Sequence, residues 1–129
     1  TYVTIPGGAK NRGGLINIGT DIYFGDASSI NKKIYKIPTT GSSAGTATAI
    51  QSGMSDLVLS FLPRKLSYDG TNLYAWELTT HQIYKIPINS DGTAGTVVSF
   101  VGASTQGLVN GIGSVARFYQ PYDMIPNLW

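Results

Sequence analysis

Few residues in this chain could carry out chemistry. Its 129 residues include one histidine, His81, and no cysteine. A serine–histidine–aspartate triad would have to use His81, and a zinc site built from several histidines is impossible. Disulfides and cysteine-based redox or metal chemistry are also excluded. We therefore expect no catalytic role, no metal site and no cofactor.

Seven carboxylates are the remaining candidate acids, and most have neighbours that favour structural roles. Asp69 and Asp91 each precede a glycine, which is typical of tight turns. Asp26 and Glu77 take equivalent positions, each at the end of a short strand-like run. Two interpretations of this pair stay open. Either each acid makes a structural hydrogen bond that fixes the next turn, or the two line a rim that binds Ca²⁺ or a sugar hydroxyl.

Aromatic side chains are the best candidates for binding. Trp76 lies next to Glu77, and an aromatic face beside a carboxylate is typical of sugar platforms and of protein interfaces. The uncharged C-terminal stretch contains Tyr119, Tyr122 and Trp129 together with two prolines. We expect this stretch to pack against a neighbouring subunit or repeat unit. The predicted binding residues are Asp26, Trp76, Glu77, Tyr119, Tyr122 and Trp129.

Gly111 and Gly113 resemble a glycine-rich phosphate loop only superficially. No Lys-Ser/Thr pair follows them, and no helix follows to supply its N-terminus. We expect the two glycines to permit a tight excursion between repeat units. Arg117, hydrogen-bonded to backbone carbonyls, and Phe118 would then anchor this excursion.

Composition limits the class of protein. A length of 129 residues fits a single domain, and charged residues make up 12% of the chain with a net charge of +2. This charge is too small to indicate binding to nucleic acid, and the apolar runs are too short to span a membrane. Low charge with abundant Thr, Ser, Tyr and Gly is common in exported proteins of bacteria. We expect a secreted or cell-surface protein of prokaryotic origin, and a start at Thr1 indicates a processed or excised segment.

An internal repeat organises the chain. The sequence IYKIP occurs at Ile34–Pro38 and again at Ile83–Pro87, and AGT occurs twice in the same relative order. Upstream, Ile22-Tyr23 matches Leu73-Tyr74. All three pairs are spaced by about 50 residues, a period typical of repeat architectures.

Each repeat predicts four short strands separated by turns. The strands expected in the first unit are Leu15–Ile18, Ile22–Gly25, Lys33–Pro38 and Thr46–Gln51. Those expected in the second are Leu66–Tyr68, Leu73–Glu77, Gln82–Ile88 and Thr96–Val101. The fold class is therefore all-β, with antiparallel four-stranded blades of the propeller type. The single domain comprises one blade at about 13–53, a second at about 64–102, and extra terminal strands within 1–6 and 117–126, where Tyr122–Ile125 is the expected strand.

Two segments carry a family resemblance. YDGTNLYAWELTTHQIYKI (Tyr68–Ile86) resembles the NHL-type propeller repeat, and GIGSVARFYQP (Gly111–Pro121) is similar to the connection between blades of that family. The resemblance implies a propeller in which each blade packs on the next. Glu77 stands where the family usually has Asp, and Trp76 replaces a small residue. Relatives of this fold mostly bind proteins, RNA or glycans, so the resemblance alone does not assign a function.

Two blades and parts of a third cannot close a ring, so further polypeptide is expected to cover the open faces. The leading hypothesis is a non-catalytic structural or interaction module that self-assembles into a closed oligomer or filament, or docks to another protein. A glycan-binding lectin using Trp76 and Glu77 is the alternative. An enzyme of the lactonase or lyase type is the third hypothesis. It is disfavoured because such sites need several convergent polar side chains, and this sequence supplies few.

Overall fold

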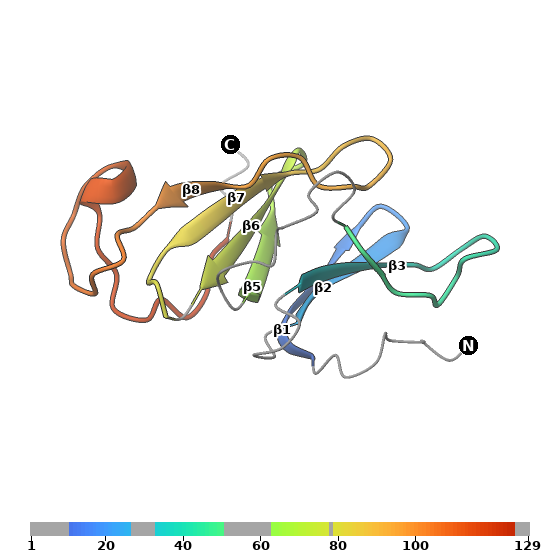
Figure 1. Cartoon of the computed structure of the whole chain (residues 1–129), viewed down its shortest axis with the longest axis horizontal. Coiled ribbons are helices and arrows are strands. Elements are labelled where there is room, and N and C mark those ends of the chain that lie inside the picture. The colour runs from blue at the N-terminus through green and yellow to red at the C-terminus, as the bar shows by residue number, and fades with distance from the viewer. Residues whose placement is uncertain (1–10, 27–32, 51–62, 78, 126–129) are drawn as a thin grey trace.

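The computed structural model describes residues 11–26, 33–50, 63–77 and 79–125, and these are almost entirely β-structure (Figure 1). Eight strands form two four-stranded antiparallel sheets, which stay open and do not close into a barrel. One short 3-10 helix, η1 (Gly113–Val115), is the only helix in the described part. The strands are β1 (Asn11–Ile18), β2 (Asp21–Asp26), β3 (Lys33–Pro38), β4 (Thr48–Ala49), β5 (Pro63–Tyr68), β6 (Asn72–Glu77), β7 (Ile83–Pro87) and β8 (Val98–Val101).

Each sheet is a meander, with spatial order β1-β2-β3-β4 in the first and β5-β6-β7-β8 in the second. Tight hairpin turns produce this order. The first turn contains Gly19 with a φ of 60°, and the corresponding turn of the second sheet contains Gly70 with a φ of 97°. Glycine adopts such positive φ angles without a steric penalty from a Cβ atom.

The predicted strands are confirmed, with small differences at their ends. The largest differences are at β1, which begins at Asn11 rather than at the predicted Leu15, and at β4, which is shorter than the predicted range Thr46–Gln51. The C-terminal prediction was wrong, because Tyr122–Ile125 forms no strand in the structure. No edge of either described sheet pairs with this segment, so its backbone lacks the ladder that defines a strand. The other terminal strand, within 1–6, lies outside the described residues.

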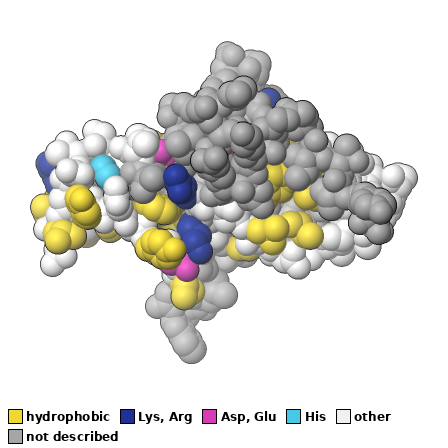
Figure 2. Space-filling model, turned by 90° about the horizontal axis from the view of Figure 1, so that it is seen from below, with side chains coloured by type: hydrophobic (Ala, Val, Ile, Leu, Met, Phe, Trp, Pro, Cys, Tyr) yellow, Lys and Arg dark blue, Asp and Glu magenta, His cyan; other side chains and the backbone are white. Residues whose placement is uncertain are grey.

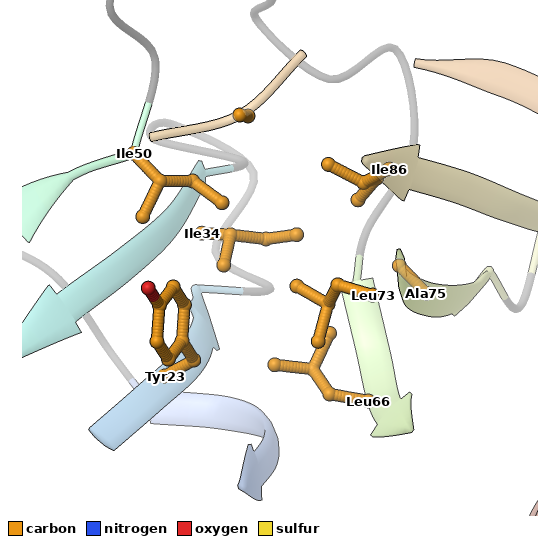
Figure 3. Close-up of a cluster of buried hydrophobic side chains, with 8 residues drawn as sticks. Tyr23, Ile34, Ile50, Leu66, Leu73, Ala75 and Ile86 are labelled. Carbon is orange, nitrogen blue, oxygen red and sulfur yellow. The ribbon is translucent and has the colours of Figure 1, made fainter. Parts of the chain in front are cut away.

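The two sheets pack through one shared hydrophobic cluster (Figure 3). Because side chains alternate between the faces of a strand, each sheet directs every second residue toward the other sheet. Figure 3 shows the labelled side chains of the two sheets pointing toward one another. The first sheet and the residue that follows it contribute Tyr23, Ile34 and Ile50, and the second sheet with its β7–β8 turn contributes Leu66, Leu73, Ala75, Ile86 and Ala94.

Glycines allow the sheets to meet at very short range where β1 and β2 lie against β5. A Cβ atom on Gly14 would lie 2.7 Å from the backbone nitrogen of Leu66 and 2.9 Å from Cα of Lys65. A Cβ on Gly25 would lie 2.4 Å from the carbonyl oxygen of Pro63. Real side chains do not tolerate such contacts with backbone, so these positions require glycine for the observed packing.

Polar contacts hold the sheets together at the rim of this interface. The Tyr23 hydroxyl donates to the Gly92 carbonyl oxygen at 3.1 Å, and the Lys36 ammonium donates to the Asp91 carbonyl oxygen at 3.0 Å. Both acceptors belong to the turn between β7 and β8. Burial is the main cause that raises the pKa of Tyr23 to about 12, so its hydroxyl stays protonated as a donor.

A second hydrophobic cluster lies on the opposite face of the first sheet. It contains Phe24, Tyr35, Ile37 and Ala47, and the rings of Phe24 and Tyr35 are stacked with their centroids 5.2 Å apart. All four side chains are buried. Both faces of the first sheet therefore carry buried apolar side chains.

Candidate interaction surface

Trp76, Glu77 and Asp26 all lie in the interior of the molecule. Trp76 is 6% exposed, and the two acids are completely buried. A ligand could reach these side chains only by displacing the residues around them. Their positions therefore do not favour a sugar platform at Trp76 or an open rim site at the two acids. The sequence alone could not show this, because the residue types in a strand do not indicate which of its two faces other segments cover.

The Glu77 carboxylate fixes the turn that follows β6. Its Oε1 accepts a hydrogen bond from the Thr79 hydroxyl at 2.6 Å, and its Oε2 accepts one from the backbone N–H of Thr80. Burial acts to raise the pKa of Glu77, but the hydrogen bonds from Thr79 and Thr80 outweigh burial and hold the pKa below its ordinary value. These contacts agree with the structural interpretation of this acid.

The single histidine also belongs to this turn. His81 has a φ of 54°, and its side chain is buried. Within the described part of the chain, Nδ1 of His81 has no hydrogen-bond partner. No carboxylate or hydroxyl is held on this nitrogen in the described structure, so the arrangement of a catalytic triad is not found there.

The connection that follows β8 turns tightly at its glycines. Gly113 has a φ of 58°, and a Cβ on Gly111 would lie 2.7 Å from the Val115 side chain. The backbone N–H and C=O of Arg117 pair with Val109, which closes the excursion as an isolated bridge. Gly113 also accepts a hydrogen bond from the Gly102 N–H at 3.1 Å.

Arg117 and Phe118 anchor this connection differently from the prediction. The backbone of Arg117, rather than its guanidinium, makes the bonds to Val109. The exposed Arg117 side chain lies over Gly107, where a Cβ atom would stand 3.3 Å from the arginine Cδ. The Phe118 ring packs near Gly102, where a Cβ would lie 3.2 Å from its Cδ2. The Phe118 carbonyl accepts a hydrogen bond from Gly107.

The C-terminal stretch crosses the outer face of the second sheet. Asp123 pairs with Lys65 of β5 at 3.7 Å, and Met124 and Ile125 line a pocket on this face. Tyr119 is 59% exposed and Tyr122 is 84% exposed. Trp129 lies outside the described residues. The structure therefore places both described tyrosines where a partner could contact them.

The pocket under this stretch has a volume of about 330 Å³. Tyr74 of β6 and Phe100 of β8 form its aromatic wall, with ring centroids 5.2 Å apart. The Tyr74 hydroxyl donates to Oδ2 of Asp69 at 2.8 Å. Hydrogen bonds to Asp69, above all from the backbone N–H of Asn72, hold the pKa of this carboxyl well below its usual range. The remaining lining residues are Ser67, Ile83, Met124 and Ile125.

Exposed large hydrophobic side chains concentrate in the C-terminal part of the chain, and Figure 2 shows hydrophobic side chains at the surface of the end formed by the second sheet. Nearly all such residues in the described structure follow β7 in the sequence. Exposed apolar side chains that gather in one part of a chain are candidates for contact with a partner. They are Val98, Phe100, Leu108, Val109, Ile112, Val115, Tyr119, Tyr122 and Ile125.

Tyr23 and Tyr74 are equivalent positions of the repeat, and the structure places them in different surroundings. Tyr23 is buried between the sheets, whereas Tyr74 is only partly buried on the outer face. The signal that could have found this face was the repeat itself. It places Phe100 at the position of Ile50, which the first unit buries against the second.

No protein-family model matches the sequence, and a search of curated proteins finds no significant relative. Among the residues that the structure describes, no cluster of three or more His, Cys, Asp or Glu side chains could hold a metal ion. None of the described helical segments has the length and apolar character to cross a membrane.

Proposed function

We propose that this chain is a non-catalytic structural or interaction module that works by self-assembly or by docking to another protein. The observation that carries the proposal is the outer face of the second sheet. Tyr74, Ile83 and Phe100 line an apolar pocket there, and the surrounding C-terminal region exposes many further hydrophobic side chains. Surfaces of this kind lose unfavourable contact with water when a partner covers them.

The NHL-type resemblance adds a compatible architecture to this proposal. In a propeller, each four-stranded blade packs face to face on the next one, as the two sheets of this chain do. A secreted or cell-surface location is part of the same proposal and rests on the low charge and the absence of cysteine. The non-catalytic part rests on the shortage of convergent acid, base and nucleophile groups in the sequence.

The lectin alternative loses its main support. It required Trp76 and Glu77 to be open to a sugar, and both side chains are buried. Glu77 is also already occupied by the Thr79 and Thr80 hydrogen bonds. We therefore retain protein binding, with the protein itself as the first partner to test.

Light scattering coupled to size exclusion tests the proposal by giving the mass of the protein over a range of concentrations. We expect a mass above that of the 13.7 kDa monomer, and a monomeric or insoluble product after removal of residues 119–129. The double variant Tyr119→Ser/Tyr122→Ser is the milder test, because both side chains are exposed and their loss should leave the fold intact.

An assembly mass that is unchanged in both altered proteins would argue against a role for the C-terminal stretch. If the untruncated chain stays monomeric at all concentrations, self-assembly is excluded and only docking to a different protein remains as the proposed function.

A further inference from the structure

A second cavity, which we call the inter-sheet groove, lies where hairpin turns of the two sheets meet. Residues of three turns line it: the turn between β1 and β2, the turn between β5 and β6, and the turn between β7 and β8. The β7–β8 turn reaches across to the first sheet (Figure 1). The groove has a volume of about 540 Å³. Small-molecule sites have volumes of roughly 300–1,000 Å³, so the groove can hold a small ligand.

The floor of the inter-sheet groove is apolar and firmly packed. Ile18, Tyr68 and Ile88 line the groove and also pack against the hydrophobic cluster that the two sheets share. All three side chains are only partly buried, so each keeps some surface that a ligand could contact. Because the cluster holds them from below, this surface is formed before a ligand arrives.

Each turn adds neutral polar side chains to the rim. Thr20 comes from the β1–β2 turn, Thr71 from the β5–β6 turn, and Asn89 and Ser90 from the β7–β8 turn. All four are exposed. A hydroxyl group both donates and accepts hydrogen bonds, and an asparagine amide does so through its two atoms. The rim therefore offers both kinds of hydrogen bond around an apolar floor.

Two carboxylates add acceptors at the same rim. Oδ1 of Asp91 accepts hydrogen bonds from the backbone N–H of Thr93 at 2.9 Å and from its hydroxyl at 2.6 Å, which orients the carboxylate. Oδ2 of Asp21 lies 3.5 Å from the Lys36 ammonium. Both acids line the groove, one from each sheet. A carboxylate accepts strong hydrogen bonds from hydroxyl groups.

The tyrosine at the base of the rim shows that these groups lie close together. The Tyr23 hydroxyl donates to the Gly92 carbonyl oxygen at 3.1 Å. Burial is the main cause that raises its pKa to about 12, and Asp21, Tyr68 and Asp91 raise it further through their charges. Groups from both sheets therefore act on a single point of the groove.

The charges of the groove disfavour an ionic ligand. None of the described lining residues is basic, so a phosphate would meet the two carboxylates without a cation from the lining. The Lys36 ammonium is held by Asp21 and by the Asp91 carbonyl oxygen. No cluster of three or more metal-binding side chains occurs among the described residues. These features favour a neutral ligand that carries many hydroxyl groups.

We propose that the inter-sheet groove binds a neutral saccharide. A sugar ring has apolar C–H faces and hydroxyl groups at its edge, which matches an apolar floor within a polar rim. The ring would lie against Ile18, Tyr68 and Ile88, and its hydroxyls would bond to the polar side chains of the three turns. This site shares no residue with the buried pair Trp76 and Glu77, and it is independent of the self-assembly proposed above.

Two variants test the groove by different means. Thr71→Trp should fill it, and because Thr71 is exposed the variant should fold. Thr105→Trp, on the exposed loop after β8, is the matched control with the same substitution outside the groove. Tyr68→Phe keeps the packed ring and removes only the hydroxyl. We expect this loss of one hydrogen bond to weaken sugar binding by roughly three- to tenfold.

NMR titration of the isotope-labelled protein gives the readout. The neutral disaccharide probes are maltose, cellobiose, lactose and N,N′-diacetylchitobiose. Sorbitol, which has hydroxyls but no ring, and inorganic phosphate are the comparison probes. We expect at least one disaccharide to shift the amide signals of Thr20, Thr71 and Ser90 in a saturable way, and to leave that of Ser104 unchanged. Sorbitol and phosphate should shift none of them.

The other outcomes each decide against a saccharide site in this groove. If no disaccharide shifts the groove amides, or if phosphate shifts them instead, the assigned ligand class is wrong. If Thr71→Trp binds the sugar as tightly as the unaltered chain, the sugar occupies another site. Equal losses of binding in Thr71→Trp and Thr105→Trp would show that blocking the groove is not the cause.

Discussion

Glu77 is a completely buried acid, and burial alone would favour its neutral form. The hydroxyl of Thr79 and the N–H of Thr80 reverse this preference, because both donate to the carboxylate. The charge therefore stabilises a turn and is not available to an external ligand. The sequence predicted such a turn-fixing bond as one of two roles, and only the packing around β6 distinguished between them.

The pKa of Glu77 predicts how stability depends on pH. Its pKa is lowered in the folded state, so its contribution is fully present above the unfolded pKa of about 4.3 and is lost as pH falls through the folded pKa. We expect Glu77→Gln to lower the free energy of unfolding by about 1–3 kcal/mol at pH 7. The difference from the unaltered protein should narrow toward pH 3, as measured by urea unfolding at both pH values.

Asp123→Asn is the control for this measurement. Its ion pair with Lys65 is 3.7 Å long and exposed, and exposed pairs contribute little. A variant at Glu77 whose deficit is the same at pH 7 and pH 3 would show that the charge of this side chain has no stabilising role.

The contact between β1 and β5 depends on the absence of side chains at particular positions. Gly14 lies against the backbone of Lys65 and Leu66, and Gly25 lies against Pro63. Gly14 brings β1, and Gly25 brings β2, into direct contact with the backbone of β5. The same strands lie side by side in Figure 1, while β8 is at the opposite edge of the second sheet.

Gly14→Ala should separate these strands. Its Cβ would overlap backbone atoms that cannot rotate away, so we expect the free energy of unfolding to fall by about 1–3 kcal/mol or more. Gly19→Ala is the matched control in the same hairpin. Its Cβ would meet nothing within 4 Å, and the variant would carry only the cost of a positive φ, about 1 kcal/mol. Thermal unfolding of both variants tests the difference, and equal losses would contradict the close-approach argument.

The two sheets share one hydrophobic cluster, so neither has a complete core of its own on that side. Leu73 and Ile86 of the second sheet pack with Tyr23 and Ile34 of the first. A single four-stranded sheet cannot bury both of its faces, and stacked repeats gain stability mainly from their neighbours. The described sheets should therefore unfold as one cooperative unit.

Leu73→Ala tests this cooperativity. Removing a completely buried leucine should lower the free energy of unfolding by about 2–5 kcal/mol. Native-state hydrogen exchange should then show equal losses of protection in β2 and β6, although only β6 carries the substitution. Loss confined to β6 would mean that the sheets open independently. Leu108→Ala, at an exposed position, should change neither strand.

The sequence by itself determined the strands, their order and the repeat, because alternating apolar residues and turn glycines are local signals. IYKIP predicted β3 and β7 closely. The same signals failed at Tyr122–Ile125, whose composition fits a strand but which has no partner edge in the described structure.

Only the tertiary structure decided which residues are accessible. Trp76 and Tyr74 lie on the same strand and the same face of β6, yet the first is buried and the second lines an open pocket. Exposure depends on what segments distant in the sequence lie over each side chain, and no local pattern encodes that. For this reason the accessible candidate residues are Tyr74 and Phe100, and not the buried Trp76 and Glu77 that the sequence indicated.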